Sequence, residues 1–403
     1  MEAVRRDEEW LLVFPVREPG EAGEIVQRVW PGRPDPVPCR VARRVSARAL
    51  WAKLMRATFD AAEPGVLFVD RINRLNNLWY CEQISATNPC GEIPLPPYGA
   101  CDLGSINLTR FVREPFSTNA RVDMEGIAAT AVIATRMLDN VIDLSQFPLP
   151  RQQQQARGSR RIGLGITGLA DAMIMLGLTY GSDEARRFAA SVMETVCHAA
   201  YRASIELAKE KGSFPFFEKV GYLQGEFVRA LPQDIRDSIA AHGIRNSHLT
   251  AIAPTGTISL LADNVSSGLE PAFDFYYTRR VLELDGSYTE YPLTDYALRA
   301  WRDLHKDAPL PAAFIDARSL PPQTHLDMQA ALQPYVDNAI SKTINIPQDY
   351  DFVAFQNIYE LAYDKGLKGC TTFRPNPVTG EVLHAVENAE RGVHCCTVER
   401  EAD

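Results

Sequence analysis

The stretch "KTINIPQDYDFVAFQNIYELAYDKGLKGCTTFR", residues 342–374, predicts a strand, a helix and a second strand in succession. Two short runs with β-branched residues, KTINIP (342–347) and GCTTFR (369–374), flank residues 350–366, where apolar side chains recur at helical spacing. A helix that joins two strands of one sheet implies that the strands are parallel and that the crossover is right-handed. The sequence therefore predicts an α/β fold.

The rest of the chain also alternates between helical and extended patterns. Apolar spacing and good helix formers predict three further helices, over residues 47–62, 124–144 and 182–212. A buried strand is expected over 65–72, after a Pro-Gly break. The segment HLTAIAPTGTISLLA (248–262) predicts a strand, a tight turn and the start of a helix. Residues 17–38, with several Pro and Gly, are expected to be rich in loops.

Length, charge and cysteine content narrow the classes of function. The chain has 403 residues, 46% of them hydrophobic, enough for one large domain or two smaller ones. Net charge is −9 without a long run of Lys and Arg, so binding to a nucleic-acid polymer is not expected. No apolar run approaches the roughly 18 residues of a membrane span, and the charged start MEAVRRDEEW is unlike a signal peptide. A cytoplasmic location is expected, where eight cysteines favour catalysis, metal binding or core packing over a disulfide scaffold.

Cys90 lies between an amide and a carboxylate in NPCGE (88–92), within a stretch dense in Pro and Gly. If this backbone is extended, Asn88, Cys90 and Glu92 share one face, because side chains at i and i+2 point the same way. A thiol between these groups has the parts for hydrogen or proton transfer at a bound substrate. A structural turn with one packed cysteine is an equally good interpretation of so short a pattern.

Cys101 follows eleven positions after Cys90, in GACDLGSIN, where a strand is expected to leave the loop. As one member of a redox pair it would need a second thiol, with the two Cα atoms within roughly 7 Å. Taken alone, Cys101 is better interpreted as a small residue of the core.

The segment APTGTIS (253–259) ends a strand at Pro254 and opens a helix with small residues. Free backbone N–H groups and the positive end of the helix dipole suit a phosphate at such a turn. An ordinary helix cap by Thr255 or Thr257 explains the same residues nearly as well.

Two further patterns carry weaker signals. GLGITG (163–168) matches G-x-G-x-x-G, but the polar RQQQQARGSRRI before it is poor strand material for a dinucleotide site. We expect a glycine-rich start of a helix packed against a neighbour.

Cys395 and Cys396 could form a reductant tail or, with His394, part of a metal site, but the ligands are too few for closed zinc coordination. An exposed terminal segment is the preferred interpretation, and no metal site is predicted.

Six segments in order resemble the catalytic subunit of ribonucleotide reductase, most closely its adenosylcobalamin-dependent class (class II). They are EPGVLFVDRIN, ATNPCGEIPLPPYGACDLGSINLTRFV, RRIGLGITGLADAM, IAPTGTISLLADNVSSGLEPAF, SKTINIP and KGCTTFRPNP. The sequence NPCGE and the spacing of eleven positions between Cys90 and Cys101 resemble class II. Class I enzymes usually show a different residue before the cysteine and a longer insertion. The resemblance implies a ten-stranded α/β barrel with a central finger loop, here residues 86–104, that carries the radical cysteine.

The resemblance also implies a role for each candidate residue in reducing ribonucleotides, which we expect to be diphosphates, to 2′-deoxyribonucleotides for DNA synthesis. Cys90 would become a thiyl radical through adenosylcobalamin and take the 3′ hydrogen of the ribose. Glu92 would accept the 3′-hydroxyl proton and Asn88 would orient the sugar. Cys101 would be one of two thiols that end as a disulfide, which a dithiol such as thioredoxin reduces again. The substrate phosphates would be held by Pro254, Thr255, Gly256, Thr257 and Ile258.

The chain departs from the family at its beginning. Family members carry a long N-terminal region with allosteric nucleotide sites, the first half of the barrel and the second redox cysteine, whereas Cys39 here lies in a Pro-rich stretch. We expect residues 1–64 to be a partial N-terminal barrel segment, 65–385 to be the second half of the barrel, and 386–403 to be a C-terminal tail. Another chain could supply the missing half. The alternative is a truncated or split-gene fragment that is inactive alone and acts only as a partner subunit.

Overall fold

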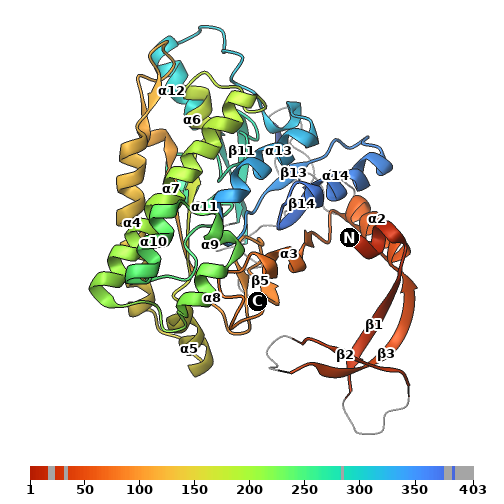
Figure 1. Ribbon diagram of the computed structural model, residues 1–403. Helices are drawn as coiled ribbons and strands as arrows, with labels where there is room; N and C mark the ends of the chain where they lie inside the picture. The colour runs from red at the N-terminus through yellow and green to blue at the C-terminus, as the bar shows by residue number, and fades with distance from the viewer. Residues whose placement is uncertain (17–22, 31–34, 283–285, 376–383, 386–403) are drawn as a thin grey trace.

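The computed structural model describes residues 1–16, 23–30, 35–282, 286–375 and 384–385. A three-stranded antiparallel arm projects from the body of the molecule near the N-terminus (Figure 1). Its strands are β1 (Glu9–Pro15), β2 (Ile25–Arg28) and β3 (Val37–Ser46), in the order β1-β3-β2. Strand β2 and the first residues of β3 lie within the segment for which loops were expected.

The arm is anchored to the body by the helix that follows it, α2 (Ala47–Ala61), which confirms the helix expected over residues 47–62. The Ser46 hydroxyl caps this helix by accepting a hydrogen bond from the Ala49 N–H at 3.0 Å. On the body side, the Phe59 ring packs edge-on against Phe355 in α14 (Phe352–Asp364), with ring centroids 5.2 Å apart. This aromatic contact holds α2 against the βαβ unit.

Parallel strands form the centre of the body. Strand β7 (Asp102–Asn107) pairs in parallel with β10 (Ile162–Thr167). Parallel bridges join Leu164 to Thr250 and Ile252 to Ile340, so residues 250–252 continue the sheet toward β13. Strand β13 (Thr343–Asn345) pairs in parallel with β14 (Gly369–Phe373), and the short β4 (Val66–Leu67) is antiparallel to β14. The α/β class and the parallel βαβ unit are confirmed, and the strands within the described residues do not close into a barrel.

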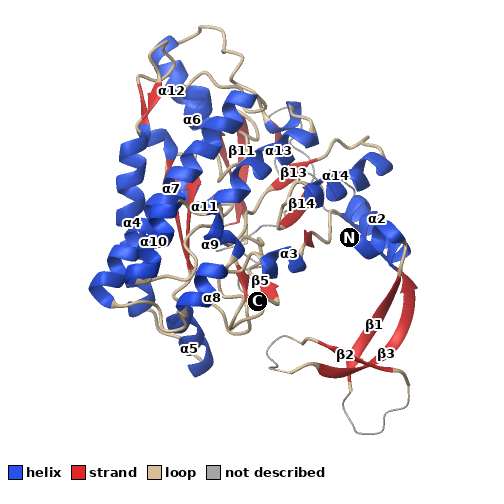
Figure 2. Cartoon of the chain, viewed as in Figure 1, coloured by secondary structure: helices blue, strands red, loops and turns tan. Residues whose placement is uncertain are grey.

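Long helices cover this sheet (Figure 2). Helices α4 (Met124–Leu144) and α7 (Asp183–Lys211) confirm the helices expected over 124–144 and 182–212. The other helical elements are α1 (Glu2–Arg6), α3 (Val69–Arg74), η1 (Leu108–Phe111), α5 (Pro150–Ser159), α6 (Leu169–Met175), α8 (Lys219–Gln224), α9 (Glu226–Ala230), α10 (Gln233–His242), α11 (Gly256–Leu261), α12 (Tyr296–His305), η2 (Ala317–Ser319), α13 (Pro322–Leu332) and η3 (Gln333–Tyr335). The remaining strands are β5 (Ala86–Thr87), β6 (Pro94–Leu95), β8 (Val112–Arg113), β9 (Arg121–Val122), β11 (Tyr276–Leu282), β12 (Tyr288–Thr294) and β15 (His384–Ala385). No helix in the described part of the chain combines the length and apolar character needed to cross a membrane.

Two expected elements differ from the structure. The strand expected over 65–72 is only two residues long, and α3 begins at Val69. The segment GLGIT, expected to start a helix, lies inside the fully buried strand β10, and helix α6 follows at Leu169. Glycine is required at position 165 of this strand, because a Cβ there would overlap the carbonyl oxygen of Ala251 on the neighbouring strand. The motif is therefore a closely packed strand without the phosphate-binding turn of a dinucleotide site.

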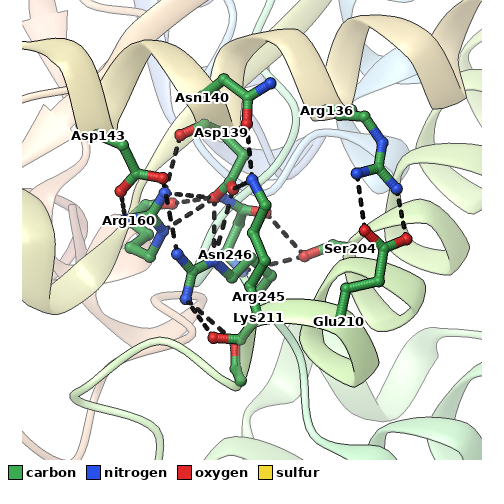
Figure 3. A network of polar contacts seen from close by, with 11 residues as sticks. Arg136, Asp139, Asn140, Asp143, Arg160, Ser204, Glu210, Lys211, Arg245 and Asn246 are labelled. Carbon is green, nitrogen blue, oxygen red and sulfur yellow. Dashed lines mark hydrogen bonds and ion pairs between the residues drawn. The ribbon is translucent and has the colours of Figure 1, made fainter.

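A buried ionic network joins α4, α7, Arg160 at the end of α5, and the loop residues Arg245 and Asn246 (Figure 3). The Asp139 carboxylate, fully buried, accepts from the Arg160 Nε at 2.8 Å and lies 3.2 Å from the Lys211 Nζ. Arg245 and Asn246 also contact Asp139, at 3.4 Å and 3.1 Å. Because these four partners come from three segments outside α4, this carboxylate fixes how the two long helices pack near the amino end of β10.

Candidate active site

The NPCGE segment forms a tight turn at the tip of the hairpin made by β5 and β6. The Gly91 N–H donates to the Asn88 carbonyl at 3.1 Å, and Gly91 adopts a φ of 81°, which suits glycine. The expectation that Asn88, Cys90 and Glu92 share one face of an extended strand is therefore wrong. The turn places Cys90 on the exposed side and buries Glu92.

Asn88 uses part of its side chain to hold this turn. Its Oδ1 accepts from the Ile93 N–H at 2.9 Å, and its own N–H donates to the Ile93 carbonyl at 3.2 Å. The Nδ2 donors of Asn88 take no part in these two bonds. A ligand at this loop could therefore meet the amide nitrogen of Asn88, while the amide oxygen serves the loop.

Glu92 is the most unusual polar residue of the loop. Only 2% of its surface is exposed, and its Oε2 atom is buried without a hydrogen-bond partner. Its carbonyl accepts from the Ala339 N–H at 2.9 Å, which ties the loop to the strand segment beside residues 250–252. A buried carboxylate oxygen without a partner costs stability unless a ligand completes it.

The finger loop, β7 and residues 250–252 meet around Gly163. A Cβ at this position would lie 2.9 Å from the Ala251 Cβ, 3.1 Å from the Ile93 Cδ1 and 2.7 Å from the Leu103 Cδ2. Glycine is therefore required for the loop to lie this close to the sheet. The finger loop, the start of β7 and residues 250–252 therefore lie against one another at Gly163.

Cys101 immediately precedes β7 and is partly buried. Its Sγ lies 3.5 Å from the Asp102 carbonyl oxygen, and burial raises the pKa of the thiol well above its usual range. The cysteines in the described residues, at positions 39, 81, 90, 101, 197 and 370, form no disulfide with one another. Cys395 and Cys396 lie outside the described residues.

The expected phosphate turn follows residues 250–252 at the carboxyl end of the sheet. Thr255 adopts a left-handed conformation with a φ of 58°, and α11 begins at Gly256 without a side-chain cap. The Thr255 hydroxyl lies 2.8 Å from the Thr167 hydroxyl and accepts from the Gly268 N–H at 2.7 Å. A helix cap by the Thr255 side chain is therefore excluded. Open space surrounds Gly256, where an added Cβ would meet no atom within 4 Å.

Several residues that organise this turn were missed in the sequence. The Asp171 carboxylate accepts from the Ser266 N–H at 2.8 Å, and the Thr167 hydroxyl donates to the Ser266 carbonyl at 3.1 Å. These bonds fix the loop that supplies Gly268 to Thr255. A polar residue directly after a buried strand, such as Thr167, is the one sequence signal that could have identified them. Asp171 lies in an otherwise apolar helical segment, so its burial was not expected.

These features define an α/β protein whose parallel strands carry a thiol-bearing loop and, after residues 250–252, a small turn that opens α11. A family model described as "Ribonucleotide reductase, barrel domain" matches residues 1–373. The chain belongs to this family.

Similar proteins agree with this assignment. The chain is 37% identical over 361 residues to a "Vitamin B12-dependent ribonucleoside-diphosphate reductase" of Mycobacterium tuberculosis, an alignment covering 85% of this chain and 49% of the relative. It is 34% identical to a protein of the same name from Thermoplasma acidophilum, covering 86% of the chain and 45% of the relative. A "Ribonucleoside-diphosphate reductase large subunit" of Arabidopsis thaliana is 29% identical, with 96% and 53% covered. The chain thus spans about half the length of the curated relatives it matches.

Proposed function

We propose that this chain provides the radical half of a site that reduces ribonucleoside diphosphates to 2′-deoxyribonucleotides. The observation that carries the proposal is the buried Glu92 carboxylate with its unpartnered Oε2, two residues from the exposed Cys90. A substrate hydroxyl at this oxygen would supply the missing hydrogen bond. The names of the relatives support the substrate class and a cobalamin cofactor.

Each candidate residue has a role that its surroundings allow. As a thiyl radical, the Cys90 sulfur takes the 3′ hydrogen atom of the ribose, which leaves a 3′ carbon radical, and it later returns the hydrogen atom. Glu92 Oε2 accepts the proton of the 3′-hydroxyl, which helps the 2′-hydroxyl leave as water. The Nδ2 group of Asn88 orients the sugar, since Oδ1 already serves the turn.

Cys101 supplies one of the two thiols that become a disulfide as the product forms, so that dithiol oxidation balances ribose reduction. An external dithiol of the thioredoxin kind reduces this disulfide. The backbone from Pro254 to Ile258 holds the phosphates, consistent with the uncapped start of α11 and the open space at Gly256.

Adenosylcobalamin, when bound, supplies the radical equivalent that removes a hydrogen atom from the Cys90 thiol. The exposure of Cys90 fits a radical source that reaches the thiol from outside the loop. Within the ten-stranded barrel of the family, the parallel strands from β7 to β14 would form the second half. Residues 1–64 would belong to the preceding half and 386–403 would form a tail. The alternative proposal, a partner subunit that is inactive alone, rests on the half-length match to the relatives.

Glu92→Gln in the complete enzyme tests the role of the carboxylate. We expect turnover to fall by a factor of about 10² to 10⁴, because the amide cannot accept the proton. Substrate affinity, measured by calorimetry, should change little. Glu125→Gln, at an exposed position of α4, is the matched control and should leave both quantities unchanged. Turnover of Glu92→Gln within a factor of three of the wild type would refute the assignment.

A further inference from the structure

Arg161 is a buried cation that contacts three separate segments around the finger loop. Its Nη1 donates to the Pro94 carbonyl at 3.3 Å and to the Asn338 Oδ1 at 3.2 Å. Its Nη2 forms an ion pair with the carboxylate of Glu82, which precedes the loop in the chain. Both side chains of this pair are at least 95% buried, since their exposed fractions are 2% and 5%. One guanidinium therefore joins the beginning of the loop to its return strand.

The contact of Arg161 with Asn338 links Arg161 indirectly to Glu92. Asn338 donates from its Nδ2 to the Ile162 carbonyl at 3.1 Å and to the Thr250 carbonyl at 3.0 Å, so it is fixed between two strands. The next residue, Ala339, donates its N–H to the Glu92 carbonyl. Arg161 thus holds the loop through Pro94 and also holds the segment to which Glu92 is bonded.

Arg161 and Cys101 are also near one another, each directly before the first residue of a paired strand. In the parallel pairing of β10 with β7, Ile162 opposite Asp102 is the first pair, and Arg161 and Cys101 are the residues that precede it in the two chain segments. Adjacent strands are about 5 Å apart, and residues opposite one another project to the same face. The same guanidinium is therefore close to the thiol and to the finger loop.

We propose that Arg161 is a positioning residue that sets the finger loop on the sheet and places a positive charge next to the Cys101 thiol. The assignment of a reaction to that loop rests on the proposed function. The contacts themselves do not, because they join residues of this chain only. A residue with both effects would influence the position of the loop that carries Cys90 and the reactivity of the Cys101 thiol.

The charges around Cys101 give the electrostatic effect a definite sign. Burial raises the pKa of Cys101, and the nearby carboxylates of Asp102, Asp337 and Glu92 act in the same direction. Arg161 is the group that lowers this pKa, because a cation stabilises the thiolate. Removing its charge should therefore raise the pKa further and slow every reaction of the thiolate.

The test uses the full 403-residue chain with Arg161→Gln, and with Arg157→Gln as the matched control on the exposed side of α5. The first readout is alkylation of Cys101 by iodoacetamide near pH 8.5, followed by peptide mass spectrometry. We expect the rate to fall about tenfold in Arg161→Gln, because the thiolate fraction of Cys101 decreases when the cation is removed, and to stay constant in Arg157→Gln. Arg161→Lys keeps the charge and should remain within about twofold of the wild type.

The second readout is hydrogen exchange at the Ala339 N–H, which reports on the bond to Glu92. Exchange should accelerate in Arg161→Gln and in Arg161→Lys, because neither side chain reproduces the planar fork of arginine. If Arg161→Gln does not fold, the double variant Arg161→Gln/Glu82→Gln removes both buried charges and is measured instead. An unchanged alkylation rate or unchanged Ala339 protection in a folded variant would overturn the proposal. Neither readout depends on turnover, so failure of the proposed reaction would be seen separately.

Discussion

At the scale of single residues, the finger loop combines an exposed thiol with a buried carboxylate oxygen that lacks a partner. The residue types could be identified from the sequence, because Asn88, Cys90 and Glu92 stand together in a short motif. Their orientation could not, because the Asn88 side chain bonds to its own loop and converts the segment into a turn. Local side-chain bonds of Asn to nearby backbone compete with extended structure in this way.

Asp295 and Asp171 form a second residue-scale feature, a buried carboxyl pair close to the turn at residues 254–258. Burial raises the pKa of Asp295 to about 6, and burial together with Asp295 raises the pKa of Asp171 well above its usual range. Arg299 acts against both increases. Asp295 also caps α12 by accepting from the Leu298 N–H at 3.1 Å.

This pair predicts a pH dependence of stability. A carboxyl whose folded pKa is raised stabilises the fold below its unfolded pKa near 4, and this contribution is lost as the pH rises through about 6. From pH 4 to pH 8, the wild type should therefore lose on the order of 1–3 kcal/mol of unfolding free energy relative to Asp295→Asn. Urea denaturation at the two pH values measures the difference. Asp351→Asn, at the exposed cap of α14, is the control, and a pH-independent difference for Asp295→Asn would contradict the account.

At the scale of elements, the long helices and the two strands of the βαβ unit could be predicted from the sequence, whereas β10 and the short length of β4 could not. Helices α4 and α7 follow sustained apolar periodicity, which fixes both their type and their length. Strand β10 contains two glycines, weak strand formers that are required here by close contacts to Ala251. Strand β4 is short because α3 begins almost at once. Tertiary packing, which local sequence does not report, decided these elements.

The buried network at Asp139 leads to a prediction about which carboxylate contributes most to the packing of α4 and α7. Asp139→Asn should lower the unfolding free energy by about 3 kcal/mol, because it leaves the buried Arg160 without its main countercharge. Asp143→Asn, one turn further along α4, is the matched control. Its side chain is 45% exposed, so its loss should cost less than about 1 kcal/mol. Denaturant titration measures the unfolding free energy of both variants. Equal decreases would contradict the prediction that the buried carboxylate of Asp139 contributes more to stability than the exposed one of Asp143.

At the scale of the whole molecule, the parallel strands at the centre of the body do not close into a barrel within the described residues, and the chain spans about half the length of its relatives. The α/β class could be predicted from one βαβ unit, since parallel pairing and connection follow from it. The arm could not be predicted, because residues 17–38 have the composition of loops. The pairing of β1 with β3 joins segments on either side of this stretch. The central claim at this scale is that one cysteine of this half performs the radical step.

The most direct test of that claim is formation of deoxynucleoside diphosphate in the presence of adenosylcobalamin and a dithiol. The chain is assayed by itself and with a polypeptide that supplies the other half of the relatives' length, each as the wild type and as Cys90→Ser. The account predicts product from the wild-type combination and none above background from Cys90→Ser, although the variant still binds substrate. It also predicts little product from the chain by itself, because Cys101 has no second thiol bonded to it in the described structure. Turnover by Cys90→Ser within tenfold of the wild type would contradict the account.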